Sequence, residues 1–354
     1  MISQTPLLIS TPTNITYLTG FTGVSPAERE AFVLMLHNQL VFFTNALYEE
    51  QAIKTLTSRF KHYLITTALL SKNKPLGLWL NEILEKERVS TLFFESDNLT
   101  VAESVKISKH LSKISLIAAN GQIEAVRQIK QADELKSIRQ ACKLTDRCFT
   151  FILKQLKPGI TESHVAWEIE KYFKEKGAGL AFTPIVAFGK NSSMPHYTPM
   201  NVKLKKNTLI LLDFGARING YCADMTRVVF FGKPTIEQTN AYTAVLTAQE
   251  KAVMLLKKGE RSGSLLDQLT KESIQQSGFP PYQHSLGHGV GLDIHESPRL
   301  TVHKDMDLKS GMVVSVEPGT YIAGKFGIRI EDLVHIEKNR VNLLSTSDKS
   351  LIII

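Results

Sequence analysis

Residues 209–226 read LILLDFGARINGYCADMT, and this stretch decides the fold of the second half of the chain. Apolar residues on both sides of Asn219-Gly220 predict two antiparallel strands, because this dipeptide is typical of a two-residue hairpin turn. With that turn, Asp213 lies opposite Thr226. Side chains alternate along a strand, so Asp213 and Asp224 share one face of the hairpin as diagonal neighbours.

Two carboxylates on an otherwise apolar hairpin are costly to bury unless a cation neutralises them. A divalent metal ion is a suitable cation, because paired carboxylates are ligands that such ions accept. An exposed face with two solvated aspartates is the alternative, since carboxylates are common on protein surfaces. The first hairpin by itself therefore leaves both a metal site and a solvated face open.

A second predicted hairpin repeats the arrangement. Glu317 ends its first strand, and Glu331 lies on the returning strand fourteen residues later. The even spacing permits a shared face, but the loop between the strands leaves the register open. A surface ion pair between Glu331 and Arg329 is the alternative. If all four carboxylates of the two hairpins meet, their charge of about −4 would be balanced by two divalent ions.

Histidines gather in a glycine-rich segment, HSLGHGVGLDIHE, at residues 284–296. A lone histidine is more often structural than a ligand, but three among glycines suit the wall of a site, because glycine lets backbones approach closely. The segment contributes His284, His288 and His295, and a turn-rich loop adds His196. Imidazole and carboxylate donors together suit divalent metals such as Mn²⁺, Co²⁺ or Fe²⁺.

The chain as a whole alternates two kinds of pattern. Residues 1 to about 120 alternate short apolar strands with helical stretches, which predicts an α/β domain. A helical pattern from 123 to about 155 opens a second region, in which helices alternate with the two hairpins and form two similar halves. We therefore expect an N-terminal α/β domain over residues 1–122 and an α+β domain over residues 123–354.

Composition excludes several classes of protein. The 354 residues predict about two domains, and 43% hydrophobic with 21% charged residues is typical of globular proteins. Three cysteines without a C-x-x-C motif exclude a disulfide scaffold and a cysteine-rich zinc site. The net charge of +8 is scattered, which favours solvated faces over nucleic-acid or membrane binding. Without a signal segment or an apolar run near the roughly 18 residues of a membrane span, we expect a cytoplasmic protein.

Together, the motifs resemble the pita-bread metallopeptidases, and within them the Xaa-Pro peptidases aminopeptidase P and prolidase. Residues 14–23, 94–95 and 127–130 resemble the creatinase-like N-terminal domain more weakly, which argues against methionine aminopeptidase. The resemblance implies an α/β creatinase-like domain followed by a pseudo-twofold pita-bread catalytic domain of the creatinase/aminopeptidase kind. The matching stretches of the second domain are residues 182–189, 195–196, 212–216, 220–227, 284–296, 316–321 and 327–332.

The resemblance also implies a role for each candidate residue. Two divalent metal ions per subunit are implied, with manganese first and cobalt, iron or zinc as alternatives. Their ligands would be Asp213, Asp224, His288, Glu317 and Glu331. The catalytic residues would be His196, His295 and Glu317, of which Glu317 takes a proton from a water molecule between the two ions. His196, His284 and His295 would bind the substrate, with His284 lining the pocket. The residues that orient the carboxylates would be Thr226, Tyr321 and Arg329.

The implied activity is hydrolysis of the bond between a first residue and a following proline. We expect an Xaa-Pro aminopeptidase that takes peptides with proline in second position and forms a homodimer, without nucleic-acid or membrane partners. The alternative is a prolidase restricted to dipeptides, which needs an arginine or lysine to receive the carboxylate of proline. A non-catalytic peptide-binding relative and a creatinase-like amidinohydrolase are less favoured, because every metal ligand is present.

Overall fold

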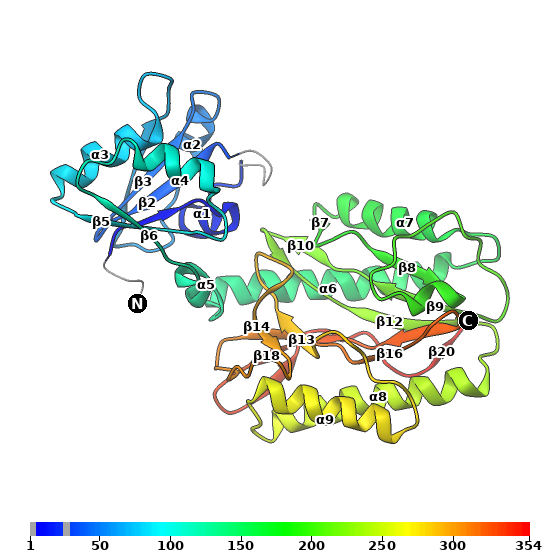
Figure 1. Cartoon of the computed structure of the whole chain (residues 1–354). Helices are drawn as coiled ribbons and strands as arrows, with labels where there is room; N and C mark the ends of the chain where they lie inside the picture. The colour runs from blue at the N-terminus through cyan, green and yellow to red at the C-terminus, as the bar shows by residue number, and fades with distance from the viewer. Residues whose placement is uncertain (1–4, 24–28) are drawn as a thin grey trace. The chain divides into compact units, whose positions relative to one another are not determined.

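The computed structural model describes residues 5–23 and 29–354, and the chain forms two compact units that divide between Arg127 and Gln128. In Figure 1 the colour of the first unit runs from blue to cyan. The predicted boundary lay between residues 122 and 123. The units divide later because Arg127, the last residue of α5 (Gln122–Arg127), donates from Nη1 to Asn14 Oδ1 at 2.7 Å. The predicted absence of a signal segment falls partly on residues 1–4, outside the described residues.

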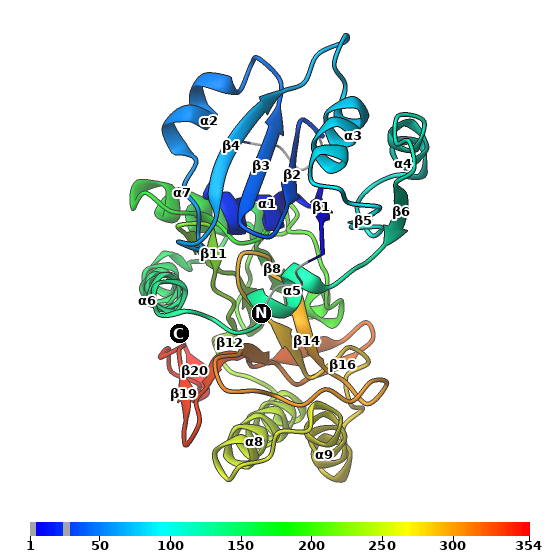
Figure 2. The same ribbon diagram turned by 90° about the vertical axis from the view of Figure 1, so that its left-hand side faces the viewer.

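A six-stranded sheet forms the N-terminal unit, with the strand order β4-β3-β2-β1-β5-β6 (Figure 2). β2 is antiparallel to β1 and β3, and the other neighbouring strands are parallel. This sheet and its helices confirm the predicted α/β class. The elements are β1 (Leu7–Ile9), α1 (Pro12–Thr19), β2 (Ala31–Met35), β3 (Gln39–Thr44), α2 (Glu49–Thr55), β4 (Leu64–Leu69), α3 (Leu76–Lys86), β5 (Thr91–Phe94), α4 (Val101–Ser108) and β6 (Ser115–Ala118).

Glu95, directly after β5, holds the start of α1. Its buried carboxylate accepts hydrogen bonds from the backbone N–H groups of Ser10 at 2.8 Å and Thr11 at 2.7 Å. Burial raises the pKa of Glu95, and the N–H groups at the start of the helix oppose that rise. The sequence analysis did not predict α1, because the group that caps it is 84 residues away from Thr11 along the chain. It also did not predict β1 and β6.

Two helix–hairpin halves form the C-terminal unit, as the pita-bread expectation required. The first half comprises α6 (Ala132–Gln155), α7 (Glu162–Glu175), β9 (Thr208–Asp213) and β12 (Thr226–Phe231). The second comprises α8 (Ile236–Lys257), α9 (Gly263–Gln276), β15 (Val313–Val316) and β18 (Asp332–Ile336). The shorter elements are β7 (Gly179–Leu180), β8 (Ile185–Phe188), η1 (Gly189–Ser193), β10 (Ala216–Ile218), β11 (Tyr221–Cys222), β13 (Gly287–Gly289), β14 (Glu296–Leu300), β16 (Gly319–Ile322), β17 (Phe326–Arg329), β19 (Val341–Leu343) and β20 (Ile352–Ile353).

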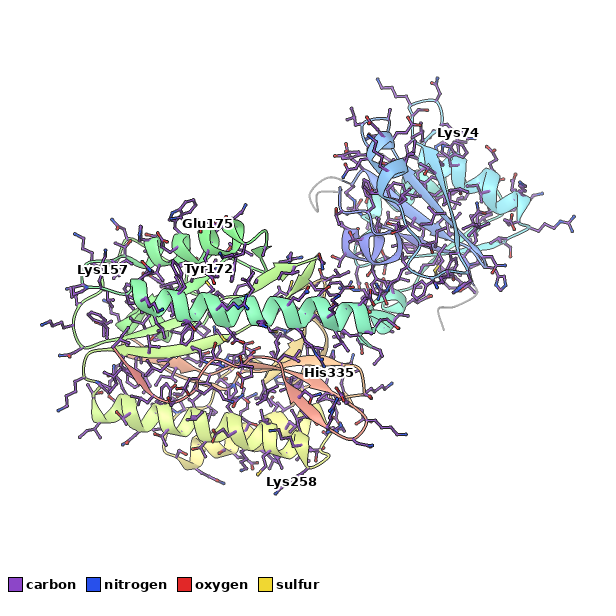
Figure 3. All side chains as sticks on the ribbon, turned by 180° about the vertical axis from the view of Figure 1, so that it is seen from behind. Lys74, Lys157, Tyr172, Glu175, Lys258 and His335 are labelled. Carbon is purple, nitrogen blue, oxygen red and sulfur yellow. The ribbon has the colours of Figure 1, made fainter. Side chains whose placement is uncertain are left out.

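The two helix pairs lie on opposite sides of the strands of this unit, with α6 and α7 on one side and α8 and α9 on the other (Figure 1). Phe230 of β12 packs on Tyr242 of α8, with ring centroids 6.0 Å apart. Phe151 of α6 stacks on Tyr172 of α7 at 4.9 Å, and Tyr172 is labelled in Figure 3. Each helix buries one face, although α7 leaves Trp167 and α8 leaves Ile236 exposed. Among the residues that the structure describes, none of the helices is long and apolar enough to cross a membrane.

The first hairpin has the predicted register but is interrupted. Asp213 pairs with Thr226, and Ile218 pairs with Tyr221 across the Asn219-Gly220 turn. Each predicted strand breaks in two, between β9 and β10 and between β11 and β12, because the two backbones approach too closely for regular pairing at Gly215. A Cβ atom on Gly215 would lie 1.7 Å from the carbonyl oxygen of Ala223. The break leaves Asp213 and Asp224 next to a bend in the hairpin.

Replacing Gly215 by alanine should lower the thermal unfolding midpoint, because the new methyl group would displace the backbone that carries Asp224. Forcing an atom into a packed interior costs about 1–3 kcal/mol, which corresponds to roughly 2–10 °C for a unit of this size. Scanning fluorimetry of metal-free protein measures the shift. The control Gly179→Ala meets its nearest neighbour, Arg217 Cβ, at 3.9 Å and should change little. Equal midpoints for the two variants would contradict the close approach.

Candidate metal centre

One cavity of about 530 Å³ in the C-terminal unit is lined by every predicted metal ligand and by all four predicted histidines. The cavity lies where the two hairpins and the glycine-rich segment meet. Residues that are far apart in the sequence therefore contribute to one wall. The predicted ligands are Asp213 at the end of β9, Asp224 before β12, His288 in β13, Glu317 after β15 and Glu331 before β18.

The second hairpin has a register that the sequence left open. Val316 of β15 pairs with Asp332 of β18. Glu317 and Glu331 are the next residues outward from this pair, so both carboxylates emerge at the same end of the hairpin. The backbone N–H of Glu331 donates to the carbonyl of Thr226 at 3.2 Å, which joins the second hairpin to the first. The two hairpins thus present their acidic ends to each other.

Asp224, His288 and Glu331 form the tightest group, since each offers a ligand atom within 4.8 Å of the other two. His288 Nδ1 lies 3.1 Å from the carbonyl oxygen of Gly289, which can only accept, so Nδ1 carries the proton. Nε2 therefore faces the carboxylates, 3.1 Å from Glu317 Oε1 and 3.7 Å from Asp224 Oδ2. Fixing the tautomer in this way leaves Nε2 as the metal-binding nitrogen.

Arg329 connects the carboxylates on the other side of the cavity. Its Nη2 forms an ion pair with Asp213 Oδ2, and its Nε donates to Thr226 Oγ1 at 3.0 Å. Thr226 in turn donates to Glu331 Oε2 at 2.7 Å, and Arg329 Nη1 donates to Tyr321 Oη at 2.7 Å. Arg329 is buried and pairs with Asp213, so the alternative of a surface pair with Glu331 is wrong. The predicted orienting residues thus all contact a carboxylate or its partner.

Burial and mutual repulsion determine the protonation of these acids. Burial raises the pKa of Asp224 well above its usual range, and the charges of Glu331 and Asp213 raise it further. The pKa of Glu331 is raised in the same way, by burial and by Glu317 and Asp213. Burial would also raise the pKa of Glu317, but the neighbouring His288, 3.1 Å away, outweighs it and lowers that pKa to about 2. Ionising these acids together is therefore unfavourable, and Arg329 offsets only part of their mutual repulsion.

The donor set fits a divalent cation. Asp213 Oδ1 and Glu331 Oε1 are buried without a hydrogen-bond partner, although their second oxygens are bonded. Buried carboxylate oxygens in that state need a cation. The donors are oxygens and one imidazole nitrogen, which suits hard or borderline divalent metals. Asp213, Asp224, His288, Glu317 and Glu331 are the residues that would hold such an ion.

His284 lines the cavity but has both ring nitrogens engaged inside the protein. Nδ1 donates to the carbonyl of Ser285 at 2.8 Å, and Nε2 lies 3.1 Å from Tyr321 Oη. Since Nδ1 must carry the proton, the Tyr321 hydroxyl donates to Nε2. Burial lowers the pKa of His284, which agrees with this neutral tautomer. Substrate contact, which the family resemblance implies for His284, would use the ring face that Tyr282 does not cover, while Nε2 orients Tyr321.

His295 lies at the exposed rim of the cavity. Its ring meets the ring of His288 edge to face, with centroids 4.4 Å apart. Burial of the ring, with the neighbouring His288, lowers the pKa of His295 to about 4. His196, on the opposite loop, is also exposed. These two are thus the exposed histidines in the wall of the cavity.

Two buried acids that the sequence analysis missed hold the histidine loops. Glu162 is fully buried and accepts hydrogen bonds from Phe188 N at 2.7 Å and from the hydroxyl of Tyr197, next to His196, at 2.7 Å. Asp267 accepts a hydrogen bond at 2.9 Å from Tyr282, whose ring stacks on His284. Glu162 follows the N-cap Thr161, an ordinary place for an acid, so the sequence carried no signal of this role.

Arg299 is a further residue that the sequence analysis missed. It lines the cavity, is exposed, and lies opposite His288 in the pairing of β13 with β14. Arg329 is bound to Asp213, whereas Arg299 forms no ion pair with any carboxylate in the described part of the chain. The sequence showed only a single arginine in a strand. Its position facing the cavity follows from the register.

Known proteins resemble this chain along nearly its whole length. A model described as metallopeptidase family M24 matches residues 136–338, and one described as the Creatinase/Prolidase N-terminal domain matches residues 6–129. The uncharacterized peptidase YqhT of Bacillus subtilis is 35% identical over 350 residues, which cover 98% of this chain and 95% of that protein. The Xaa-Pro dipeptidase from Bacillus anthracis is 31% identical, with a TM-score of 0.89 and coverage of 99% of this chain and 95% of the other. The X-Pro aminopeptidase from Thermotoga maritima is 30% identical, with a TM-score of 0.87 and coverage of 99% and 97%.

Replacing Asp224 by asparagine should weaken Mn²⁺ binding at least about tenfold, because an amide offers one oxygen and no charge. Titration calorimetry of metal-free protein measures the affinity. The metal-free variant should be no less stable than the wild type, since the substitution removes repulsion among buried carboxylates. Asp307→Asn, at an exposed position, is the control. Unchanged Mn²⁺ affinity in Asp224→Asn would show that the ion binds elsewhere.

Proposed function

This chain belongs to metallopeptidase family M24, and on that premise we propose that it hydrolyses the bond between an N-terminal residue and a following proline, with dipeptides as preferred substrates. Similarity to proteins described as an Xaa-Pro dipeptidase and an X-Pro aminopeptidase supports the Xaa-Pro specificity. The observation that carries the preference for dipeptides is a free guanidinium, Arg299, in the wall of the metal-binding cavity. An aminopeptidase is the first expectation from the sequence, and we place the dipeptidase first because Arg299 supports it.

We propose that the cavity holds two divalent ions, because four carboxylates carry too much charge for one. Manganese is the first candidate, and cobalt, iron or zinc are alternatives that the same donors accept. Asp224 and Glu331, which lie close to each other and to His288, would help to hold the ions. When bound, such ions polarise a peptide carbonyl and lower the pKa of a water molecule.

The protein's own groups would bind the substrate and move protons. Glu317, whose pKa is lowered to about 2, is ionised at neutral pH and would accept the proton of the attacking water. His295, with its pKa lowered to about 4, is neutral at pH 7 and would donate a hydrogen bond to the oxygen of the tetrahedral intermediate. His196 would face it across the cavity and relay the proton taken up by Glu317 to the proline nitrogen as the C–N bond breaks.

Arg299 would receive the carboxylate of the substrate. In a dipeptide, the carboxylate of proline follows directly after the bond to be broken, so a cation is needed beside the reacting carbonyl. A guanidinium matches a carboxylate with two parallel hydrogen bonds. Arg329 is unsuitable, because Asp213, Thr226 and Tyr321 already occupy its donors. In longer peptides that carboxylate is an amide, so the charge of Arg299 would have no partner.

A cleavage assay tests the proposal. Metal-free protein with Mn²⁺ added back is given an Xaa-Pro dipeptide, an Xaa-Pro-Yaa tripeptide and an Xaa-Ala tripeptide. We expect Mn²⁺-dependent cleavage with the highest kcat/KM on the dipeptide. Preferential cleavage of the Xaa-Pro tripeptide would identify an aminopeptidase instead, the candidate that the Thermotoga maritima relative favours. No cleavage of any peptide, with Mn²⁺ shown to be bound, would favour a peptide-binding protein.

Arg299→Met should lower kcat/KM for the dipeptide roughly 10- to 100-fold, since a hydrogen bond to a charged group contributes about 1.5–3 kcal/mol. The tripeptide should be affected far less, so the ratio between the two substrates is the measurement. Lys304→Met, which removes an exposed charge further along the chain, should leave the ratio unchanged. An equal loss of kcat/KM on both substrates would mean that Arg299 does not bind the carboxylate of proline.

His295→Ala should retain Mn²⁺ and lose turnover. The ring is not among the expected ligands, and loss of a group that donates a hydrogen bond in the transition state costs about 10²–10⁴-fold in kcat. Metal content by plasma mass spectrometry and kcat are measured together. His303→Ala, at an exposed position, is the control. Loss of metal in His295→Ala would reassign this histidine as a ligand.

A homodimer and a cytoplasmic location stay predictions. The homodimer comes from the family resemblance, in which a loop of the partner helps to close the site. Sedimentation equilibrium measures the oligomeric state, and a monomer with full activity would contradict the expected role of a partner loop. Cell fractionation with an antibody against the chain tests the location.

A further inference from the structure

A buried ion pair lies directly behind the rim of the cavity. Lys130 Nζ contacts Glu296 Oε1, and the two side chains are only 1% and 7% exposed. Lysine is rarely buried, and the desolvation of two charges offsets most of their attraction, so such a pair adds little stability. Lys130 belongs to the stretch 127–130, which the family resemblance includes and to which the catalytic scheme gives no role. The pair is therefore better explained by the segment that it holds in place than by stability.

Glu296 closes the loop that carries His295. It follows His295 in the sequence and pairs with Gly289 across the bulge between β13 and β14. Its carboxylate packs under Gly291, where a Cβ atom would lie 2.6 and 2.7 Å from the two carboxylate oxygens. The loop from His288 to Glu296 is thus folded around this carboxylate, and His295 lies at its exposed end.

Lys130 is itself fixed to the second hairpin. Its backbone N–H donates to the carbonyl of Gly311 at 2.9 Å, and the N–H of Gly311 donates to Ile336 at the end of β18. A few residues further, Glu134 of α6 accepts a hydrogen bond from Tyr221 Oη at 2.9 Å, beside the first hairpin. The segment before α6 is therefore tied to both hairpins that carry the carboxylates. Through Lys130 it also contacts the loop that carries His295.

We propose that Lys130 is a positioning residue, which acts through Glu296 to keep the ring of His295 against His288 at the rim of the cavity. The other side of the loop is held by the backbone: Cys222 N donates to Gly291 O at 2.8 Å, and Arg217 Nη1 donates to Leu292 O at 3.0 Å. Without Lys130, these bonds keep the loop attached, but Glu296 turns toward water and His295 moves with it. The kinetic consequence rests on the proposed function, whereas the change in His295 does not.

Kinetics separate positioning from stability. Lys130→Met should lower kcat about 10- to 100-fold, the usual effect of removing a group that orients a functional side chain, with KM changed less and Mn²⁺ content unchanged. It should also lower the thermal midpoint, because Glu296 loses the buried cation that offsets its desolvation. The double variant Lys130→Met/Glu296→Gln removes both charges and should recover the midpoint while kcat stays low. Lys136→Met, at an exposed position of α6, is the control and should match the wild type.

Recovery of kcat together with the midpoint in the double variant would overturn the proposal, since the pair would then contribute only stability. Loss of Mn²⁺ in Lys130→Met would also overturn it, because the pair would then act through the metal ligands. Lys130→Arg, which keeps the charge, should retain most of the turnover.

A second readout needs no substrate. In metal-free protein labelled with ¹³C at histidine Cε1, the His295 resonance, assigned with His295→Ala, should shift or broaden in Lys130→Met and stay in place in Lys136→Met. The resonance of exposed His303 is the internal reference. An unmoved His295 resonance in Lys130→Met overturns the proposal. If the wild type cleaves no Xaa-Pro peptide, the proposed function fails, while this spectrum still decides the role of Lys130.

Discussion

Four carboxylates meet in one buried cavity and repel one another, and the contacts around the site in the C-terminal unit offset this repulsion. Burial and their neighbours raise the pKa of Asp224 and Glu331 well above the ordinary range. Arg329 offsets part of the charge, bonding Asp213 directly and Glu331 through Thr226. Because Asp213 and Glu331 each keep one buried oxygen without a hydrogen-bond partner, their remaining charge is available to a divalent cation. The repulsion among these buried carboxylates thus favours metal binding and, in the metal-free chain, opposes folding.

The histidines around this cluster follow a second rule: groups near the rim are held by buried polar groups behind them. Glu162 fixes the loop next to His196, Asp267 fixes the tyrosine that stacks on His284, and Glu296 packs under Gly291 in the loop that carries His295. Glu162 and Asp267 lie on α7 and α9, the second helix of each half of the unit. In each half, a buried acid on the second helix therefore accepts a hydrogen bond from a tyrosine next to a histidine of the cavity. Such hydrogen bonds hold polar side chains in place where apolar packing cannot.

Local chemistry made part of the site predictable. Asn219-Gly220 accepts positive φ angles at both turn positions, with φ of 51° and 83°, so the hairpin has one register and Asp213 meets Thr226. No comparable turn exists between Glu317 and Glu331, where β16 and β17 insert a further hairpin, and that register could be read only from the folded chain. Arg299 and Lys130 were missed for the same reason, since neither has a local pattern that distinguishes it from a surface cation.

The sequence by itself determined the two-domain organisation, the paired helix–hairpin halves, the family and the set of acids and histidines that meet in the cavity. These follow from periodicity, turn residues and ordered motifs, which act over a few residues. Tertiary structure decided which oxygen of each carboxylate is free, which tautomer His284 and His288 adopt, and which buried groups stand behind the rim. Those properties depend on contacts such as Arg329 with Asp213 and Lys130 with Glu296, 116 and 166 residues apart. Such contacts form only when the folded chain brings the two side chains together and removes water from around them.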